Sequence, residues 1–224
     1  MNNKVVHEIW KRGLSIFVPN NLPKKSIALK VDLWNETVEQ TREFSEIYKK
    51  AKFGKIIFCE INKELCKLYK KKKGEFVING DILFLPIKSN SLNVILDIST
   101  SDHFPLKKFQ NILKEYSRVL KPNGLLILFH ENKDYYLINE LNKDRPLSIP
   151  YYPRKDITIE KLLLNYFKIR RKVFLFSLIF DPFLGSLLRV IFRILRLNSL
   201  YNFFIYKLNT NRLAPIIAYQ AEKV

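Results

Sequence analysis

The chain has 224 residues, enough for one large domain with a buried core, and its 47% hydrophobic content excludes general disorder. Its net charge of +18 would attract phosphate, anionic lipid or an acidic substrate, but a composition typical of low-GC coding sequences explains the lysines equally well. Cys59 and Cys66 lack disulfide or zinc spacing and no signal peptide precedes the domain, so we expect a cytoplasmic protein without a bound metal.

Short apolar runs that alternate with helical patterns predict strands and helices in turn along the chain. An N-terminal arm, residues 1–25, precedes the domain, which extends over residues 26–224. The expected strands are β-compatible runs at residues 26–31, 55–59, 75–78, 92–96, 125–129, 171–176 and 216–224. The expected helices lie at residues 36–51, from the capping residue Asn62 through Tyr69, and at residues 109–120.

This alternation predicts an α/β fold of the doubly wound class. Strand–helix–strand units have right-handed crossovers and form a parallel sheet with helices on both faces. Ligands of such sheets bind beyond the carboxyl ends of the strands, where the strand order reverses. We therefore expect the functional residues in the loops that follow the strands.

The segment between the last two expected strands, residues 177–211, is both apolar and basic. Arg189, Arg193 and Arg196 form one stripe on an otherwise apolar helix, and Asp181-Pro182 leaves each apolar piece too short to span a bilayer. The pattern fits a helix that lies on a membrane surface, and equally a helix packed on the domain or on a second subunit. Residues 177–208 are the expected peripheral membrane contact in the first case.

The stretch from Gly80 to Phe129 carries the most information. It opens with Gly-Asp-Ile-Leu-Phe-Leu-Pro, continues through a strand that ends at Asp97, and closes with Arg-Val-Leu-Lys-Pro-Asn-Gly before another strand. This order resembles the second half of the class I S-adenosylmethionine (SAM) dependent methyltransferases, of the type 11 kind. The resemblance implies a Rossmann-like sheet of seven strands, the last of them antiparallel, and SAM as the cofactor.

The first turn departs from the pattern of this family. The family usually has an acidic residue and a Gly-x-Gly loop there, whereas residues 29–37 contain no glycine. A subset of the family is more similar, with a Lys-x-Asp-Leu-aromatic-x-Glu turn. That resemblance implies that Lys30 meets the methionine carboxylate and that Asp32 or Glu36 meets the amino group. A degenerate loop that binds no cofactor is the alternative.

Two further points of the resemblance concern the adenosine part of the cofactor. Glu60 closes the second strand, where a carboxylate can accept both ribose hydroxyl protons. Asp81 then takes the adenine amino group, and its neighbour flanks the ring. The expected cofactor-binding residues are Lys30, Asp32, Glu36, Glu60, Ile61, Asp81, Ile82, Asp97 and Ile98.

The loop that follows Asp97 is expected to reach the methyl acceptor. Asp97 and His103 are the candidate catalytic residues, because they could orient or deprotonate an acceptor hydroxyl. Histidine is the better base, since its pKa lies near neutrality. A plain helix-entry role for His103, just before Pro105, is the alternative, and His7 and His130 receive no role.

The predicted function is O-methylation of a small or lipid-linked, glycan-like acceptor near a membrane surface. The Asn-Pro-Pro-Tyr type motif of amino-group methylation is missing at residues 97–100. One alternative is an RNA methyltransferase, which the net charge and residues 170–172 favour. Another is an inactive pseudo-methyltransferase that serves as a binding subunit, which the glycine-free turn favours. The oligomeric state stays open.

Overall fold

The computed structural model of the protein describes residues 17, 23, 25–33, 37, 53–73, 76–134, 150–175, 214 and 216–224. The expected arm and the expected helix at 36–51 lie largely outside these residues. The expected insertion at 177–211, with its arginine stripe, lies wholly outside them.

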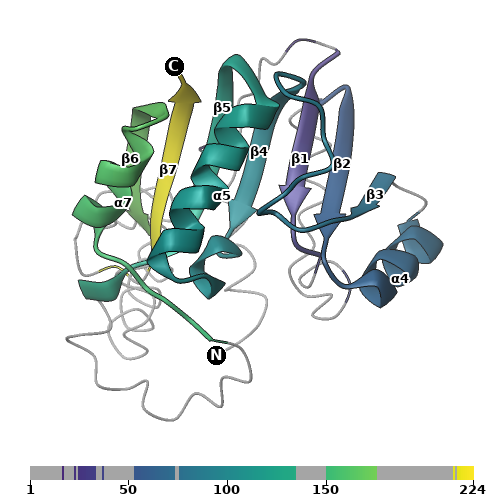
Figure 1. Cartoon of the computed structure of the whole chain (residues 1–224), viewed down its shortest axis with the longest axis horizontal. Helices are drawn as coiled ribbons and strands as arrows, with labels where there is room; N and C mark the ends of the chain where they lie inside the picture. The colour runs from purple at the N-terminus through teal and green to yellow at the C-terminus, as the bar shows by residue number, and fades with distance from the viewer. Residues whose placement is uncertain are drawn as a thin grey trace, which may run out of the picture.

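Seven strands form a single mixed sheet. They are β1 (Ile27–Val31), β2 (Lys55–Glu60), β3 (Phe76–Asn79), β4 (Leu92–Ile98), β5 (Leu120–Glu131), β6 (Phe167–Leu175) and β7 (Ile216–Lys223). Their order in the sheet is β3-β2-β1-β4-β5-β7-β6 (Figure 1). Only β7 runs antiparallel to its two neighbours, β5 and β6. The α/β fold class and the antiparallel last strand expected from the sequence are confirmed.

The sixth strand begins at residue 167, whereas the sequence predicted a start at residue 171. The early part of β6 alternates between buried and more exposed positions. Its exposed positions hold polar residues, so this part of the strand is not a continuous apolar run and was not predicted. Arg170 on this part of the strand forms an ion pair with Glu222 of β7, at 2.6 Å.

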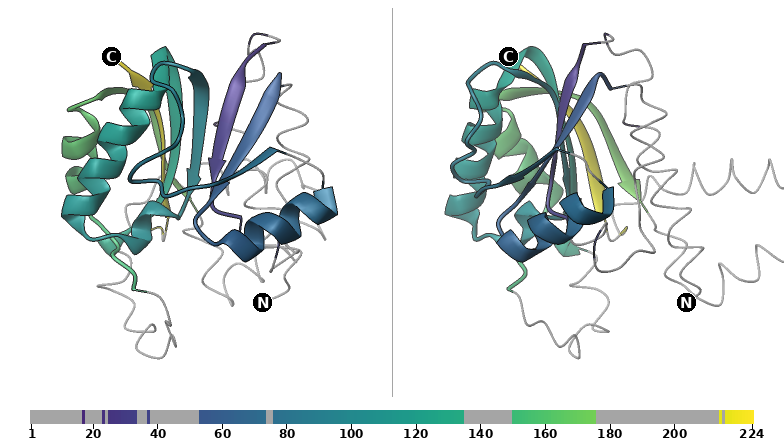
Figure 2. Two further views of the ribbon diagram at one scale, coloured as in Figure 1. Left: turned by 45° about the vertical axis from the view of Figure 1, so that its right-hand side comes forward. Right: turned by 90° about the vertical axis from the view of Figure 1, so that its right-hand side faces the viewer.

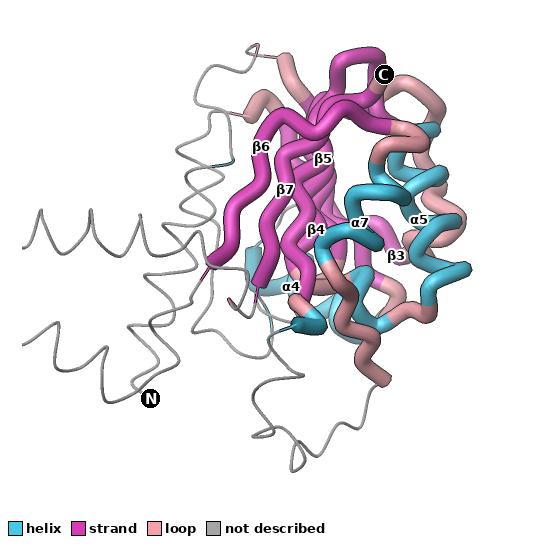
Figure 3. Tube along the Cα trace, turned by 90° about the vertical axis from the view of Figure 1, so that its left-hand side faces the viewer, coloured by secondary structure: helices cyan, strands magenta, loops and turns pink. Residues whose placement is uncertain are grey.

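The helices of the described chain are α4 (Lys63–Lys73), α5 (Leu106–Val119) and α7 (Asp156–Leu163), with a short 3₁₀ helix, η1 (Ser101–His103). Figure 3 shows α5 and α7 on the same face of the sheet. The sequence predicted α4 and α5 but not α7. Only Ile159 and Leu163 of α7 are buried, and two residues one turn apart are too few to define a helical period.

The hydrophobic core lies in two clusters, one on each face of the sheet. The first holds the buried stripe of α5, which includes Phe109 and Tyr116. The second includes Phe17 and Tyr69. The ring centroid of Tyr69 lies 4.9 Å from that of Phe58 in β2. Burial on both faces explains why the central strands read as unbroken apolar runs rather than as alternating ones.

The strand order reverses between β1 and β4, which pair in parallel in the middle of the sheet. The chain runs from β1 outward through β2 to β3 and then returns to β4. The carboxyl ends of β1, β2 and β4 therefore lie at one edge of the twisted sheet. In both views of Figure 2 this edge is the lower one, toward which the arrowheads of β1 and β2 point. This edge is where ligands of doubly wound sheets bind.

Glu115 and Arg118 on α5 hold the turn between β3 and β4. Oε1 of Glu115 accepts the backbone N–H of Leu85 at 2.7 Å, and Arg118 donates to the carbonyl oxygens of Leu85 and Ile87 at 3.0 and 2.9 Å. The two side chains also pair with each other at 2.7 Å. Burial alone would raise the pKa of Glu115, but the hydrogen bonds from Arg118 and Leu85 outweigh it and lower this pKa.

Glu115→Gln is expected to lower the unfolding temperature at neutral pH. A carboxyl group whose pKa falls on folding stabilises the protein above its ordinary pKa of 4.5, and this contribution disappears as the pH falls through the lowered value. The gap between variant and wild type should therefore close in acid. Thermal unfolding over this pH range tests the prediction, with Glu64→Gln on exposed α4 as the control. A gap that stays constant with pH would contradict it.

Candidate active site

The turn after β1 has a left-handed backbone at a residue that is not glycine. Asp32 has a φ of 68°, a region that aspartate and asparagine tolerate better than most residues. Its N–H donates to the carbonyl oxygen of Cys59 at 2.8 Å, and its own carbonyl oxygen accepts the ammonium of the fully buried Lys30. An aspartate held by two neighbours thus gives this turn the left-handed shape that usually requires glycine.

Glu60 ends β2 directly beside this turn. Its Oε2 accepts the N–H of Leu33 at 2.9 Å, and its Oε1 accepts the N–H of Asn62 at 2.8 Å. Burial raises the pKa of Glu60 against these two hydrogen bonds, and the charge of Asp32 adds to the rise. A carboxylate has about four lone-pair sites; the two N–H groups and a hydrogen bond with the Asp32 side chain use part of them, and the rest are left for a hydroxyl group of a ligand. The carboxylate therefore fits the ribose contact that the resemblance implies.

Replacement of Asp32 tests the left-handed turn. Asp32→Ala is expected to be less stable than Asp32→Gly by roughly 0.5–1 kcal/mol, because both remove the carboxylate but only glycine adopts this φ without strain. Urea unfolding of the two variants measures the difference. Equal free energies of unfolding, or a more stable alanine variant, would contradict the conformation of the turn.

The turn after β3 lies at the same edge of the sheet. A Cβ at Gly80 would lie 3.0 Å from Cδ of Pro86, closer than most Cβ contacts in proteins, so the close approach of the two residues favours glycine. Oδ1 of Asp81 accepts the N–H of Leu83 at 2.9 Å, which orients the carboxylate within the turn. The Gly-Asp and Leu-Pro pairs of the sequence are therefore parts of one compact loop.

The isoleucines expected near the cofactor differ in exposure. Ile61 is 67% exposed directly after β2, whereas Ile82 and Ile98 are buried in the two core clusters. Ile61 therefore offers its side chain to a ligand ring, whereas Ile82 and Ile98 pack in the core and offer mainly their backbone; their place at a cofactor stays a prediction. Glu36, expected at the first turn, lies outside the described residues, as does Trp34.

Asp97 is fully buried at the end of β4. Its Oδ1 accepts the N–H groups of Thr100 and Ser101 at 3.0 and 3.3 Å, and its Oδ2 accepts the hydroxyl of Tyr116 at 3.1 Å. Burial raises the pKa of Asp97 and also that of Tyr116. One carboxylate oxygen thus shapes the loop after β4, and the other connects the end of β4 to α5.

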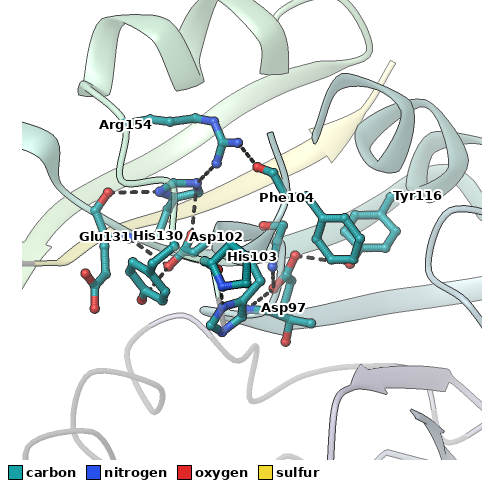
Figure 4. A network of polar contacts seen from close by, with 12 residues as sticks. Asp97, Asp102, His103, Phe104, Tyr116, His130, Glu131 and Arg154 are labelled. Atoms are coloured by element: carbon teal, nitrogen blue, oxygen red, sulfur yellow. Dashed lines mark hydrogen bonds and ion pairs between the residues drawn. The ribbon is translucent and has the colours of Figure 1, made fainter. Parts of the chain in front are cut away.

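A second buried cluster joins residues that are far apart in the sequence (Figure 4). Oδ1 of Asp102 in η1 lies 2.9 Å from Nε2 of His130 in β5. Arg154 places Nη1 2.6 Å from the same nitrogen and donates through Nη2 to the carbonyl oxygen of Phe104. The sequence singled out neither Asp102 nor Arg154 and gave His130 no role. The three residues share no motif or spacing in the sequence that would predict these contacts.

His103, the expected acceptor-side base, is half-buried at the end of η1. Its Nδ1 lies 3.0 Å from the carbonyl oxygen of Pro150, and its ring meets that of Tyr151 edge-on, with centroids 4.8 Å apart. A carbonyl oxygen only accepts, so Nδ1 carries the proton and Nε2 of the neutral ring is an acceptor. Within the part of the chain that the structure describes, Nε2 has no hydrogen-bond partner.

The predicted site residues thus fall into two groups at one edge of the sheet. Lys30, Asp32 and Glu60 are joined by the contacts between the ends of β1 and β2. Asp97 and His103 share the loop after β4. Residues with a potential cofactor role and residues with a potential acceptor role therefore flank the point where the strand order reverses.

Comparisons with known proteins bear on the fold and on the domain. Residues 39–128 match the family model of a methyltransferase domain. An uncharacterized protein of Methanocaldococcus jannaschii is 31% identical over 128 residues, which are 55% of this chain and 52% of that protein. The chain thus matches about half the length of this curated relative.

Two solved structures are similar over nearly the whole chain. A SAM-dependent methyltransferase of Archaeoglobus fulgidus has a TM-score of 0.61 at 15% identity, over 99% of this chain and 95% of that one. A geranyl diphosphate methyltransferase in complex with SAM has a TM-score of 0.60 at 11% identity, over 96% and 84%. The fold prediction is confirmed: the chain has the fold of these SAM-dependent methyltransferases, and residues 39–128 match the model of a methyltransferase domain.

Proposed function

We propose that the protein is a SAM-dependent methyltransferase that methylates an oxygen atom of a small or lipid-linked, glycan-like acceptor near a membrane surface. The observation that carries the proposal is the Glu60 carboxylate, which is fixed by two backbone N–H groups and retains lone pairs for a diol. The ammonium of Lys30, which donates to the carbonyl oxygen of Asp32 in the neighbouring turn, supplies positive charge for a ligand carboxylate. The methyltransferase family match supports the same activity.

The roles of the cofactor-side residues follow from their places in the two turns. SAM, when bound, supplies a methyl group already activated on a sulfonium, so the main task of the protein is positioning. In the proposal Glu60 accepts the ribose hydroxyls and Asp81 accepts the adenine amino group. Lys30 pairs with the methionine carboxylate, and Asp32 or Glu36 pairs with the amino group.

On the acceptor side, His103 takes a hydroxyl proton at Nε2, its ring atom without a partner in the described chain. Asp97 keeps the loop after β4 in shape, which fixes the start of η1 through Thr100 and Ser101. A misplaced base loses much of its effect, because catalysis by positioning depends on geometry at the scale of an ångström.

Calorimetric titration with SAM and with its demethylated product, S-adenosylhomocysteine, tests the proposal. One molecule of either ligand is expected to bind per chain. No heat of binding at millimolar ligand would contradict the proposal and favour the inactive binding subunit instead.

The proposed place of the acceptor needs a separate experiment. Residues 177–208, which carry the apolar and basic pattern, lie outside the described residues, and no helix within the described ones is long and apolar enough to cross a membrane. The full chain is expected to float with vesicles that contain anionic lipid and not with neutral ones. Failure to float, together with RNA binding that weakens steeply with salt, would favour the RNA methyltransferase.

A further inference from the structure

Asp102 is a buried carboxylate that the proposed reaction does not use. Its Oδ2 accepts the backbone N–H of Glu131 at 3.0 Å and the phenol of Tyr151 at 3.1 Å. Its backbone carbonyl oxygen accepts the N–H of Tyr152 at 2.7 Å. Through Oδ2 and its backbone carbonyl oxygen, this residue of η1 binds both the end of β5 and the segment that begins at residue 150, while Oδ1, 2.9 Å from Nε2 of His130, makes no hydrogen bond within the described chain.

The hydrogen bonds of Asp102 are needed for the stability of the fold, because burying a carboxylate is costly. A buried charge destabilises the fold unless it is paired and hydrogen-bonded, and Asp102 has no exposed surface. The guanidinium of Arg154, itself 5% exposed, supplies positive charge next to the His130 ring that faces Asp102. The burial of Arg154 lowers its pKa, and the charge of Asp102 opposes that change. The two charges therefore stabilise each other inside the protein.

The segment that Asp102 binds, residues 151–152 with the preceding Pro150, also contacts the ring of His103. The carbonyl oxygen of Pro150 fixes the Nδ1 proton of His103, and the ring of Tyr151 lies against the His103 ring. Both contacts depend on the position of residues 150 and 151, and the hydroxyl of Tyr151 donates to Asp102. Asp102 and His103 are adjacent in the chain, so Tyr151 contacts two consecutive residues of η1, one through its hydroxyl and the other through its ring.

We propose that Asp102 and Tyr151 are positioning residues for His103, which they hold as the Nδ1–H tautomer with Nε2 directed to the methyl acceptor. The inference rests on the proposed function. In the reaction, the acceptor oxygen bonds to the methyl carbon as the carbon–sulfur bond breaks and leaves its electron pair on sulfur. The hydroxyl proton moves to Nε2 of His103, which becomes an imidazolium, and the products are the methyl ether or ester and S-adenosylhomocysteine.

The tautomer of His103 can be measured without knowledge of the acceptor. The chain has three histidines, so ¹⁵N-histidine labelling gives a spectrum of few signals, and His103→Gln identifies the one that matters. In the wild type at a pH where the ring is neutral, the Nδ1–H form is expected to dominate. Tyr151→Phe and Asp102→Asn should each lower the ratio of Nδ1–H to Nε2–H, roughly tenfold if one hydrogen bond to a charged group is lost.

Tyr152→Phe is the matched control, because Tyr152 contacts Asp102 only through its backbone N–H and should leave the His103 signal unchanged. Tyr151→Phe keeps the ring and removes one oxygen atom, so it remains informative if Asp102→Asn fails to fold. A wild-type ring in the Nε2–H form, or an unchanged ratio in Tyr151→Phe, would overturn the proposal.

Calorimetry separates this inference from the proposed function. Tyr151→Phe should bind SAM with the wild-type affinity, because Tyr151 lies on the acceptor side of the site, away from Glu60 and Lys30. A wild-type protein that binds no SAM would overturn the proposed function, whatever the tautomer of His103. A SAM-binding protein whose tautomer ratio is insensitive to Tyr151 would overturn only the positioning role.

Discussion

Glu60→Ala is expected to weaken SAM binding by about 100-fold or more. Hydrogen bonds to a charged group contribute roughly 1.5–3 kcal/mol each, and the proposed ribose contact contains two of them. The substitution also leaves the N–H groups of Leu33 and Asn62 without their acceptor, which loosens the turn next to the ligand. Calorimetric titration of SAM into the two proteins measures the loss.

The control for this result is Glu64→Ala. Glu64 lies four residues further on in α4, and its exposed side chain pairs with Lys67 away from the turn. This variant should bind SAM as tightly as the wild type. Wild-type affinity in Glu60→Ala would contradict the assignment of Glu60 to the ribose.

A pH series gives the same assignment an independent check. The ionised form of Glu60 accepts two hydroxyl protons, and burial raises the pKa of this carboxyl above its ordinary value of 4.5. The affinity for SAM should therefore already decline at a pH above 4.5, as the carboxylate takes up a proton. In Glu60→Gln the affinity should be lower at neutral pH and should lack this part of the pH dependence.

Arg154→Ala is expected to have the largest effect on stability. Removal of one partner of a buried charge cluster destabilises by about 3–5 kcal/mol, because the remaining charge stays buried without compensation. Asp102 would lose its nearby cation, and the contact of the guanidinium with the Phe109 ring, 4.4 Å from its centroid, would also disappear. For a protein of this size the unfolding temperature should fall by roughly 6–20 °C.

Differential scanning calorimetry compares this variant with Arg170→Ala. Arg170 pairs with Glu222 on the surface of the sheet, and exposed ion pairs contribute little to stability. Arg170→Ala should therefore unfold close to the wild-type temperature. An equal shift in the two variants would show that the buried cluster adds nothing that a surface pair lacks.

The fold was predictable because its central strands are buried on both faces. β1, β2 and β4 read as short apolar runs for that reason, and the stripe of α5 has a clear helical period. The start of β6 and the whole of α7 were missed. The start of β6 has polar residues, and α7 has only two buried ones, so neither shows a clear hydrophobic period in the sequence. Both elements form because neighbouring elements pack against them.

The positions of the expected cofactor residues were predictable to a similar degree, and their role stays a prediction. Asp32, Glu60 and Asp81 end or follow strands whose carboxyl ends meet at one edge, and Lys30 lies one residue before the end of β1. The glycine-free turn looked like a departure that could abolish binding. Its left-handed Asp32 shows how another residue can occupy the position of a glycine, which the sequence alone could not establish.

The buried cluster of Asp102, His130 and Arg154 could not be predicted. Polar residues are mostly exposed, so each of the three is unremarkable in the sequence. His130 follows an apolar run and Arg154 follows Pro153, with no spacing that connects them. Their partnership exists only because the end of β5, η1 and the segment before α7 converge in space.

A crystal structure with S-adenosylhomocysteine bound tests the central claim most directly. The expected result is an adenosine group beyond the ends of β1 and β2, with both ribose hydroxyls on Glu60. A ligand bound elsewhere, or a Glu60 carboxylate that touches only the N–H groups of Leu33 and Asn62 when the ligand is present, would contradict the account.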